Sequence, residues 1–125
     1  MKYVKIINQE NPEAGMLFAG YCDSFLCRLR GMTFRREIPH DHGLLLVEGA
    51  DSRMQTAVHM LFVFFNLGII WINDAGQVVD TRLAKSWISF IMPTRPARYV
   101  LEIHPDRLSE FKIGDRIRFE EGHRS

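Results

Sequence analysis

The longest apolar stretch of the chain covers residues 57–72 and is interrupted only by His59, Asn66 and Gly68. It is shorter than the roughly 20 apolar residues that a membrane-spanning helix needs. Most of its residues are β-branched or aromatic, types that pack well on a pleated sheet and lose rotamer freedom in a helix. The pattern therefore predicts two buried strands that are separated near Asn66 to Gly68.

Shorter runs of β-forming residues between turn residues predict the other strands. These runs cover residues 3–8, 16–21, 44–47, 77–83, 99–103 and 116–119. Asn73, Asp74, Ala75 and Gly76 lie between two of the strands and predict a hairpin turn in which Gly76 has positive φ. Residues 48–55 are expected to be a polar connection.

Two short segments are typical of helices. Asp23 and Ser24 are good N-caps for a short helix, and residues 107–113 could form one or two further helical turns. The predicted fold is mainly β, a small β-sandwich or barrel of about seven strands with one or two short helices.

Residues 87–92 (WISFIM) form an apolar segment within a loop that Pro93 and Pro96 keep irregular. If this segment packs down, it covers one end of the core. If it is partly exposed, it is a protein-contact patch, because monomers seldom leave large apolar patches open.

Length and charge narrow the possibilities. The 125 residues fit a single domain, and 16 Lys and Arg against 15 Asp and Glu give a net charge of +1. This balance argues against a dedicated nucleic-acid surface, and no membrane partner or cofactor is expected. The oligomeric state is expected to be a monomer or a weak homodimer.

Cys22 and Cys27 are the only cysteines, fewer than a small secreted scaffold normally carries. We therefore expect two reduced thiols. The N-terminal residues lack the apolar core of a signal peptide. Together these features predict a cytoplasmic protein.

Three blocks resemble one family. The first block is RGMTFR at residues 30–35, which DSF precedes and Pro39 and GLLLV follow. The second block combines AVHM at residues 57–60 with IIWINDAGQVV at residues 69–79. The third block combines ARYVLEI at residues 97–103 with IGDRI at residues 113–117. In this order and spacing they are similar to the small prokaryotic domain-of-unknown-function family numbered 192, over roughly residues 17–119.

The resemblance implies a compact, mostly β domain of sandwich or barrel type and no established activity. His59 matches the family pattern. Where members often read Met-Arg-Phe-Pro-Ile-Asp, however, residues 63–68 read VFFNLG. A site formed by those polar family residues therefore does not transfer to this chain.

Histidines suggest two kinds of chemistry. His40 and His42 are spaced to project to one side of an extended segment, and with His59 and His104 they could bind a metal ion. They lie in a polar loop, however, so solvated side chains are the simpler interpretation. No metal site is therefore the preferred prediction.

His59 lies in an apolar run, where burial would keep its imidazole neutral and able to act as a base. A small hydrolase or metal-dependent enzyme centred on His59 with His40 or His42 is the alternative function. A core histidine that bonds to a backbone carbonyl is the preferred interpretation, because no Ser or Cys motif marks a nucleophile.

Arginines give the preferred functional hypothesis. Arg28, Arg30 and Arg35 lie near the predicted helix, and Arg98 and Arg95 could join them. Their guanidinium groups suit carboxylate or phosphate. We therefore predict a non-catalytic binding or interaction module for an unknown protein or a small anionic ligand, with Arg28, Arg30, Arg35, His59 and Arg98 as candidate ligand-binding residues.

Overall fold

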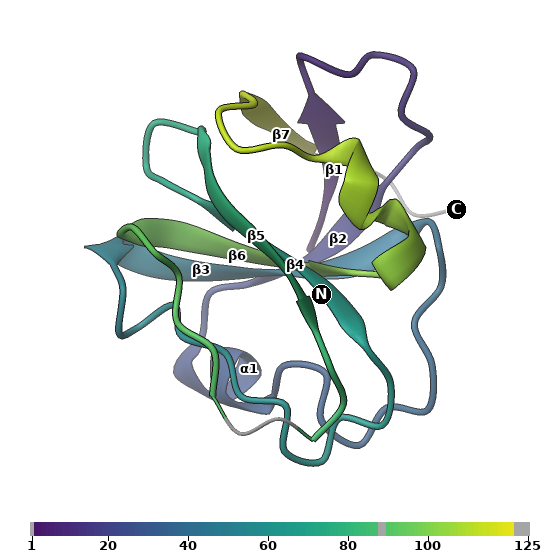
Figure 1. Cartoon of the computed structure of the whole chain (residues 1–125), viewed down its shortest axis with the longest axis vertical. Helices are drawn as coiled ribbons and strands as arrows, with labels where there is room; N and C mark the ends of the chain where they lie inside the picture. Colours follow the sequence, from purple (N-terminus) through teal and green to yellow (C-terminus); the bar gives the residue numbers. More distant parts are fainter. Residues whose placement is uncertain (1, 88–89, 122–125) are drawn as a thin grey trace.

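The structure is a computed structural model that describes residues 2–87 and 90–121. It consists of one seven-stranded sheet, curled into a half-barrel, with two short helices (Figure 1). In chain order the elements are β1 (Tyr3–Asn8), β2 (Phe18–Cys22), α1 (Phe25–Arg30), β3 (His42–Ser52), β4 (Leu67–Ile72), β5 (Val78–Ala84), β6 (Ala97–Ile103), the 3-10 helix η1 (Pro105–Glu110) and β7 (Ile117–Glu121).

The strand order across the sheet is β5-β4-β6-β3-β2-β1-β7. β2 and β3 are parallel, and the chain crosses between them through α1; the other neighbouring pairs of described strands are antiparallel. The curl brings the start of β7 to the start of β5, where the Ile117 N–H donates to the Gly76 carbonyl at 2.8 Å. The half-barrel is therefore nearly closed at this end.

Apolar side chains form a separate core on each face of the sheet. Along the central strand β6, Leu101 and Ile103 belong to the core inside the curl, whereas Val100 belongs to the outer core. Met32 and Val63, from the loops after α1 and after β3, cover the outer core. Figure 1 shows α1 on this outer side of the sheet and η1 on the other.

Several predicted elements are confirmed. β1 covers the predicted residues, and Gly76 in the β4–β5 hairpin has φ of 85°. Ser24 caps α1 by accepting the Cys27 N–H at 3.2 Å. The predicted polar connection at residues 48–55 is wrong at its start, because β3 continues to Ser52.

The prediction of two buried strands in residues 57–72 is wrong for its first half. Only β4 is a strand, and it is hydrogen-bonded on both edges, to β5 and to β6. Residues 57–66 therefore have no free edge of β4 to join, and they form a loop with one isolated bridge, between Val58 and Ile91. Leu61, Phe62 and Phe64 in this loop are exposed.

The expectation of two reduced thiols is also wrong, since Cys22 and Cys27 form a disulfide that joins the end of β2 to α1. The helical turn places their Cα atoms 5.6 Å apart, a distance that a disulfide spans readily. The cytoplasmic prediction loses the support that reduced thiols gave it. No helix among residues 2–87 and 90–121 has the length and hydrophobicity that crossing a membrane requires.

Candidate functional site

Glu102 is a buried carboxylic acid in the middle of the central strand. Its neighbours across the sheet are Leu44 in β3 and Ile69 in β4, both of which belong to the outer apolar core. Only 4% of Glu102 is exposed to solvent. Buried carboxyl groups normally have a hydrogen-bond or charge partner, so this position requires an explanation.

The carboxyl group of Glu102 is incompletely paired. Its Oε1 atom is buried and has no hydrogen-bond partner among the residues that the structure describes. Burial raises the pKa of Glu102 to about 7, and the positive charge of Arg35 opposes this rise. A buried acid that titrates near neutral pH in a hollow is a typical candidate for a functional group.

A hollow of about 40 Å³ lies over Glu102, between the end of α1 and the loop that follows β3. Gly31, which follows α1, lies beside the carboxyl, because a Cβ atom there would be 3.7 Å from Glu102 Oε1. Gly31 has φ of 51°, a conformation that favours glycine. The turn therefore leaves the hollow without a side chain above the acid. The lining residues are Arg28, Leu29, Arg30, Gly31, Met32, Thr33, Leu46, Ala57, Val58, His59, Val63 and Glu102.

Two arginines lie at the opening. Arg30 lines the hollow over Glu102 and also a wider one of about 270 Å³, to which Arg35 and Leu44 contribute. Arg30 is exposed, and its guanidinium group has no hydrogen bond or ion pair with a residue of the described ranges. The structure thus places Arg30, whose guanidinium group has no partner among the described residues, on the rim of the hollow that Glu102 also lines.

Arg28, a third predicted arginine, has a structural role. Its Nε atom pairs with Glu48 Oε2 at 2.7 Å, and its Nη1 atom donates to the main-chain carbonyls of Val47 and Asp23. These contacts attach α1 to β3 and use the Nε and Nη1 donors of Arg28. We therefore remove it from the set of ligand-binding candidates, although its side chain borders the hollow.

Arg98 is occupied in the same way. Its Nε atom donates to the Glu48 carbonyl at 2.8 Å, and its Nη1 atom donates to Asp74 Oδ1 at 2.8 Å and to the Tyr99 hydroxyl at 3.0 Å. Arg98 is absent from the lining of both hollows around Arg30. It fixes the β4–β5 hairpin against the sheet.

His59 was expected to be a buried core residue, and this expectation is wrong. It lies in the loop after β3 and is exposed, although its neighbours Val58 and Met60 are buried. It borders the hollow over Glu102. His59 therefore joins Arg30 at the site, but from the solvent side.

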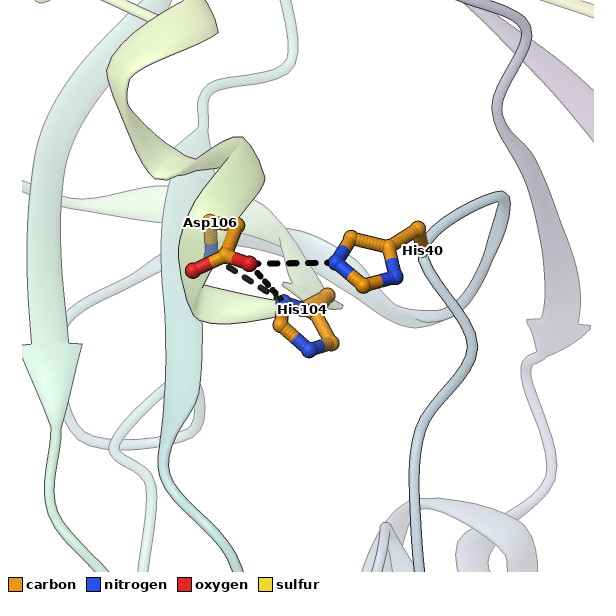
Figure 2. A group of neighbouring side chains, drawn as sticks. All are labelled: His40, His104 and Asp106. Atoms are coloured by element: carbon orange, nitrogen blue, oxygen red, sulfur yellow. Dashed lines mark hydrogen bonds and ion pairs between the residues drawn. The ribbon is translucent and has the colours of Figure 1, made fainter.

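His40 and His104 form a separate group with Asp106 (Figure 2). His40 Nε2 lies 3.1 Å from Asp106 Oδ2, and His104 Nδ1 lies 3.7 Å from the same oxygen. The hydrogen bond from His40 and the charge of His104 lower the pKa of Asp106. His42 does not belong to this group, because its Nδ1 atom lies 2.8 Å from Asp41 Oδ1.

This group could offer three ligand atoms to a metal ion, all within 4.8 Å of one another. Two features favour a structural role. His104 Nδ1 already accepts the Asp106 N–H at 3.1 Å and so caps η1. The rings of His40 and His104 stack on each other, with their centroids 3.8 Å apart. We therefore interpret the group as a helix cap with an ion pair.

Sequence reasoning identified Arg30, Arg35 and His59 but missed Glu102, to which they are adjacent. The available signal was a single acidic residue between Leu101 and Ile103, within a run of β-forming residues. An acid at a position that alternation assigns to a buried face is unusual and marks a site worth examining.

Solved structures with a similar fold include a proposed transcription regulator from Sinorhizobium meliloti, with a TM-score of 0.80, 23% identity, and coverage of 94% of this chain and 92% of that one. A protein of unknown function from Novosphingobium aromaticivorans gives a TM-score of 0.75 with 17% identity, over 93% of this chain and 83% of its own. At these identities the likeness concerns the fold.

Relatives in sequence include the UPF0127 protein TK1120 of Thermococcus kodakarensis, 31% identical over 90% of this chain and 71% of its own length. A UPF0127 protein of Thermococcus gammatolerans is 30% identical over 74% of this chain, which spans 60% of that relative. UPF0127 protein PF1050 of Pyrococcus furiosus is 32% identical over 78% of this chain and 82% of its own length. The family model described as "Uncharacterized ACR, COG1430" matches residues 7–119, and the chain therefore belongs to this family, DUF192.

Proposed function

We propose that this protein is a non-catalytic binding module for a small anionic ligand, which Arg30 and Arg35 hold above the carboxyl group of Glu102. The observation that carries the proposal is that Glu102, whose buried Oε1 atom has no hydrogen-bond partner among the described residues, lines a hollow whose rim bears Arg30, which is unpaired within the same residues. Each group lacks the kind of partner that a ligand would supply.

The chemistry of the two groups is complementary to a carboxylate or phosphate. Because burial raises the pKa of Glu102 to about 7, its neutral form is well populated at neutral and mildly acidic pH. A neutral carboxylic acid donates a hydrogen bond to an anion and does not repel it. Arg30 and Arg35 contribute charge and the forked donors that suit such groups.

The size of the hollow supports binding of one anionic group. Its volume of about 40 Å³ corresponds to roughly three water-sized positions, which is the size of a carboxylate. The wider hollow beside Arg30 and Arg35 can hold the rest of the ligand. This narrow space leaves little room for a substrate together with a nucleophile, so we favour binding over catalysis.

Calorimetric titration with acetate, citrate and inorganic phosphate tests the proposal. We expect at least one anion to bind more tightly at about pH 6 than at about pH 8, because Glu102 loses its proton across this range. The comparison of the two pH values requires an anion whose own charge does not change between them, and acetate meets this requirement.

The variant Arg30→Ala, Arg35→Ala should lose at least tenfold in affinity, whereas Arg36→Ala should not, because Arg36 lines neither hollow. Glu102→Gln should remove the pH dependence. The proposal is wrong if none of the three anions binds at either pH, or if the double variant binds them as tightly as the wild type.

A further inference from the structure

A group of four aromatic side chains lies exposed on the outer side of the molecule. Phe34, Phe62, Phe64 and Trp87 have exposed fractions of 65%, 47%, 50% and 49%. Their rings nevertheless contact one another: the centroids of Phe34 and Phe62 are 5.3 Å apart, and those of Phe62 and Trp87 are 5.0 Å apart. We call these four residues the aromatic platform.

The main chain fixes the aromatic platform in place. The Phe34 N–H donates to the Phe62 carbonyl at 2.9 Å, and the Trp87 N–H donates to the Met60 carbonyl at 2.9 Å, so three separate loops are tied together. Phe34, Phe62 and Trp87 are also the non-glycine residues with positive φ among those described, at 63°, 61° and 68°. Bulky residues rarely adopt this conformation, and it is typical of functional sites.

The surroundings of the platform are apolar and basic. The neighbouring helix α1 buries none of its six residues, and Phe25, Leu26 and Leu29 on it are 58% to 75% exposed. The sequence stretches 25–36, 57–66 and 84–87, which supply α1 and parts of the three loops, contain no Asp or Glu, and the exposed Glu37 is the next residue in the loop after α1. These stretches contain six basic or titratable side chains: Arg28, which pairs with Glu48, and Arg30, Arg35, Arg36, His59 and Lys85.

We propose that the aromatic platform docks on an anionic lipid membrane surface. Figure 1 shows the loops after α1, after β3 and after β5 gathered on the side of α1, at one end of the molecule. Aromatic rings are favoured at the boundary between headgroups and acyl chains, and arginine and lysine beside them contact anionic headgroups.

The charge pattern favours an anionic membrane over a second copy of the chain as the partner of the aromatic platform. Two such surfaces facing each other would bring arginines against arginines, with Glu37 as the nearest carboxylate in sequence to pair them. Anionic headgroups supply negative charge wherever the basic side chains lie, and an acyl boundary accepts exposed Phe and Trp rings without a preformed pocket. Contact with anionic headgroups therefore gives a role to the basic side chains around the platform, and not only to Arg30 and Arg35.

Vesicle co-sedimentation of the full chain tests the proposal. Vesicles of phosphatidylcholine alone are compared with vesicles that also contain phosphatidylglycerol, at low and at physiological salt. We expect binding to the anionic vesicles, weakened by salt, together with a blue shift of the Trp87 fluorescence. Trp87→Phe should abolish this shift, because Trp71 is buried.

Two variants separate the apolar and the ionic contributions. Phe62→Gly, Phe64→Ala should lower the partition coefficient about tenfold or more. Arg36→Ala, Lys85→Ala should lower it about twentyfold on anionic vesicles only. Neither variant removes a residue that lines the hollow over Glu102, so anion binding there should persist. Glycine suits the positive φ of Phe62, so the first variant should remain folded, which thermal unfolding checks.

Met54→Ala and Lys112→Ala are the matched controls, because both residues are exposed and lie outside the platform. The proposal is overturned if anionic vesicles do not bind the wild type, or if the platform variants bind as well as the controls. It is also overturned if the same substitutions abolish a dimer that analytical ultracentrifugation detects in the wild type, because the platform then contacts a second copy.

Discussion

Glu102 shows how one residue can combine a structural cost with a binding role. A carboxylic acid among Leu44, Ile69 and Val100 interrupts an apolar part of the outer face of the sheet. An apolar residue there would give a more stable core, so retaining the acid suggests that the carboxyl group itself is used.

The raised pKa of Glu102 makes the stability of the protein depend on pH. Its pKa is about 7 in the folded protein against 4.5 for the reference group, so between these values the folded state holds a proton that the unfolded state has released. The free energy of unfolding therefore falls as pH rises through this window, by about 3 kcal/mol in total. We expect Glu102→Gln to flatten this dependence.

Urea unfolding at several pH values between about 5 and 8 measures this effect. Glu102→Gln should match the wild type near the acidic end and exceed it in stability near the alkaline end. Parallel pH profiles for the two proteins would contradict the prediction, because they would show that Glu102 does not titrate in this range.

Sequence reasoning could find the charged residues but could not assign the partner of each one. Arg28, Arg30 and Arg35 are equivalent in the sequence pattern, yet Arg28 is bound to Glu48 while Arg30 is unpaired within the described residues. The difference depends on β3 lying beside α1, which is a tertiary fact. Glu102 was missed because its burial depends on strands on both of its sides.

Among the secondary-structure elements, those whose conformation depends on a local sequence signal were predicted correctly. The turn residues before Gly76 fixed the β4–β5 hairpin, and the cap at Ser24 fixed the start of α1. Residues 57–66 resemble a buried strand in composition, but a strand needs a partner edge, and β5 and β6 already occupy both edges of β4. Composition therefore predicted the element type wrongly.

Trp71 shows how that irregular segment is held against the sheet. The indole N–H of Trp71 in β4 donates to the Thr56 carbonyl at 2.7 Å, and both residues are buried. Trp71→Phe leaves this carbonyl unpaired and opens a small cavity, so it should lower the free energy of unfolding by about 2 to 4 kcal/mol. Chemical denaturation followed by circular dichroism measures this change.

Trp87→Phe is the matched control, because Trp87 is half exposed and its indole makes no hydrogen bond with the described residues. It should change the free energy of unfolding by less than about 0.5 kcal/mol. Equal effects of the two substitutions would show that the hydrogen bond of Trp71 does not stabilise the loop.

For the whole molecule, Arg107 connects segments that lie far apart in sequence. This buried side chain donates to the carbonyls of Gly15, Met16 and His40 at 2.7 to 2.9 Å, and it forms a two-point pair with Glu110. It therefore holds η1 to the loops before β2 and before β3. No sequence motif marks Arg107, because its role depends on the complete fold.

Arg107→Ala should lower the free energy of unfolding by about 3 to 5 kcal/mol, because it leaves three carbonyls and the partly buried carboxylate of Glu110 without their partner. Arg107→Lys should not restore stability, since an ammonium group cannot reproduce the forked geometry. Arg116→Ala is the control: Arg116 pairs with Glu10 on the surface, and its loss should cost less than about 1 kcal/mol. Thermal and urea unfolding of the three variants test this order.

The sequence predicted the β class and about seven strands, but not the order of the strands in the sheet. The pairing of β1 with β7 joins residues more than a hundred positions apart, for example Asn8 with Ile117, and no local pattern encodes such a contact.

This pairing also affects how the chain must fold. β1 is synthesised before the other described strands, yet one of its edges stays open until β7, the last of these strands, has been made. Contacts of such long sequence separation form slowly, and an open strand edge is where newly made chains pair wrongly with one another. The interval before β7 arrives is therefore the period in which this protein is most exposed to aggregation.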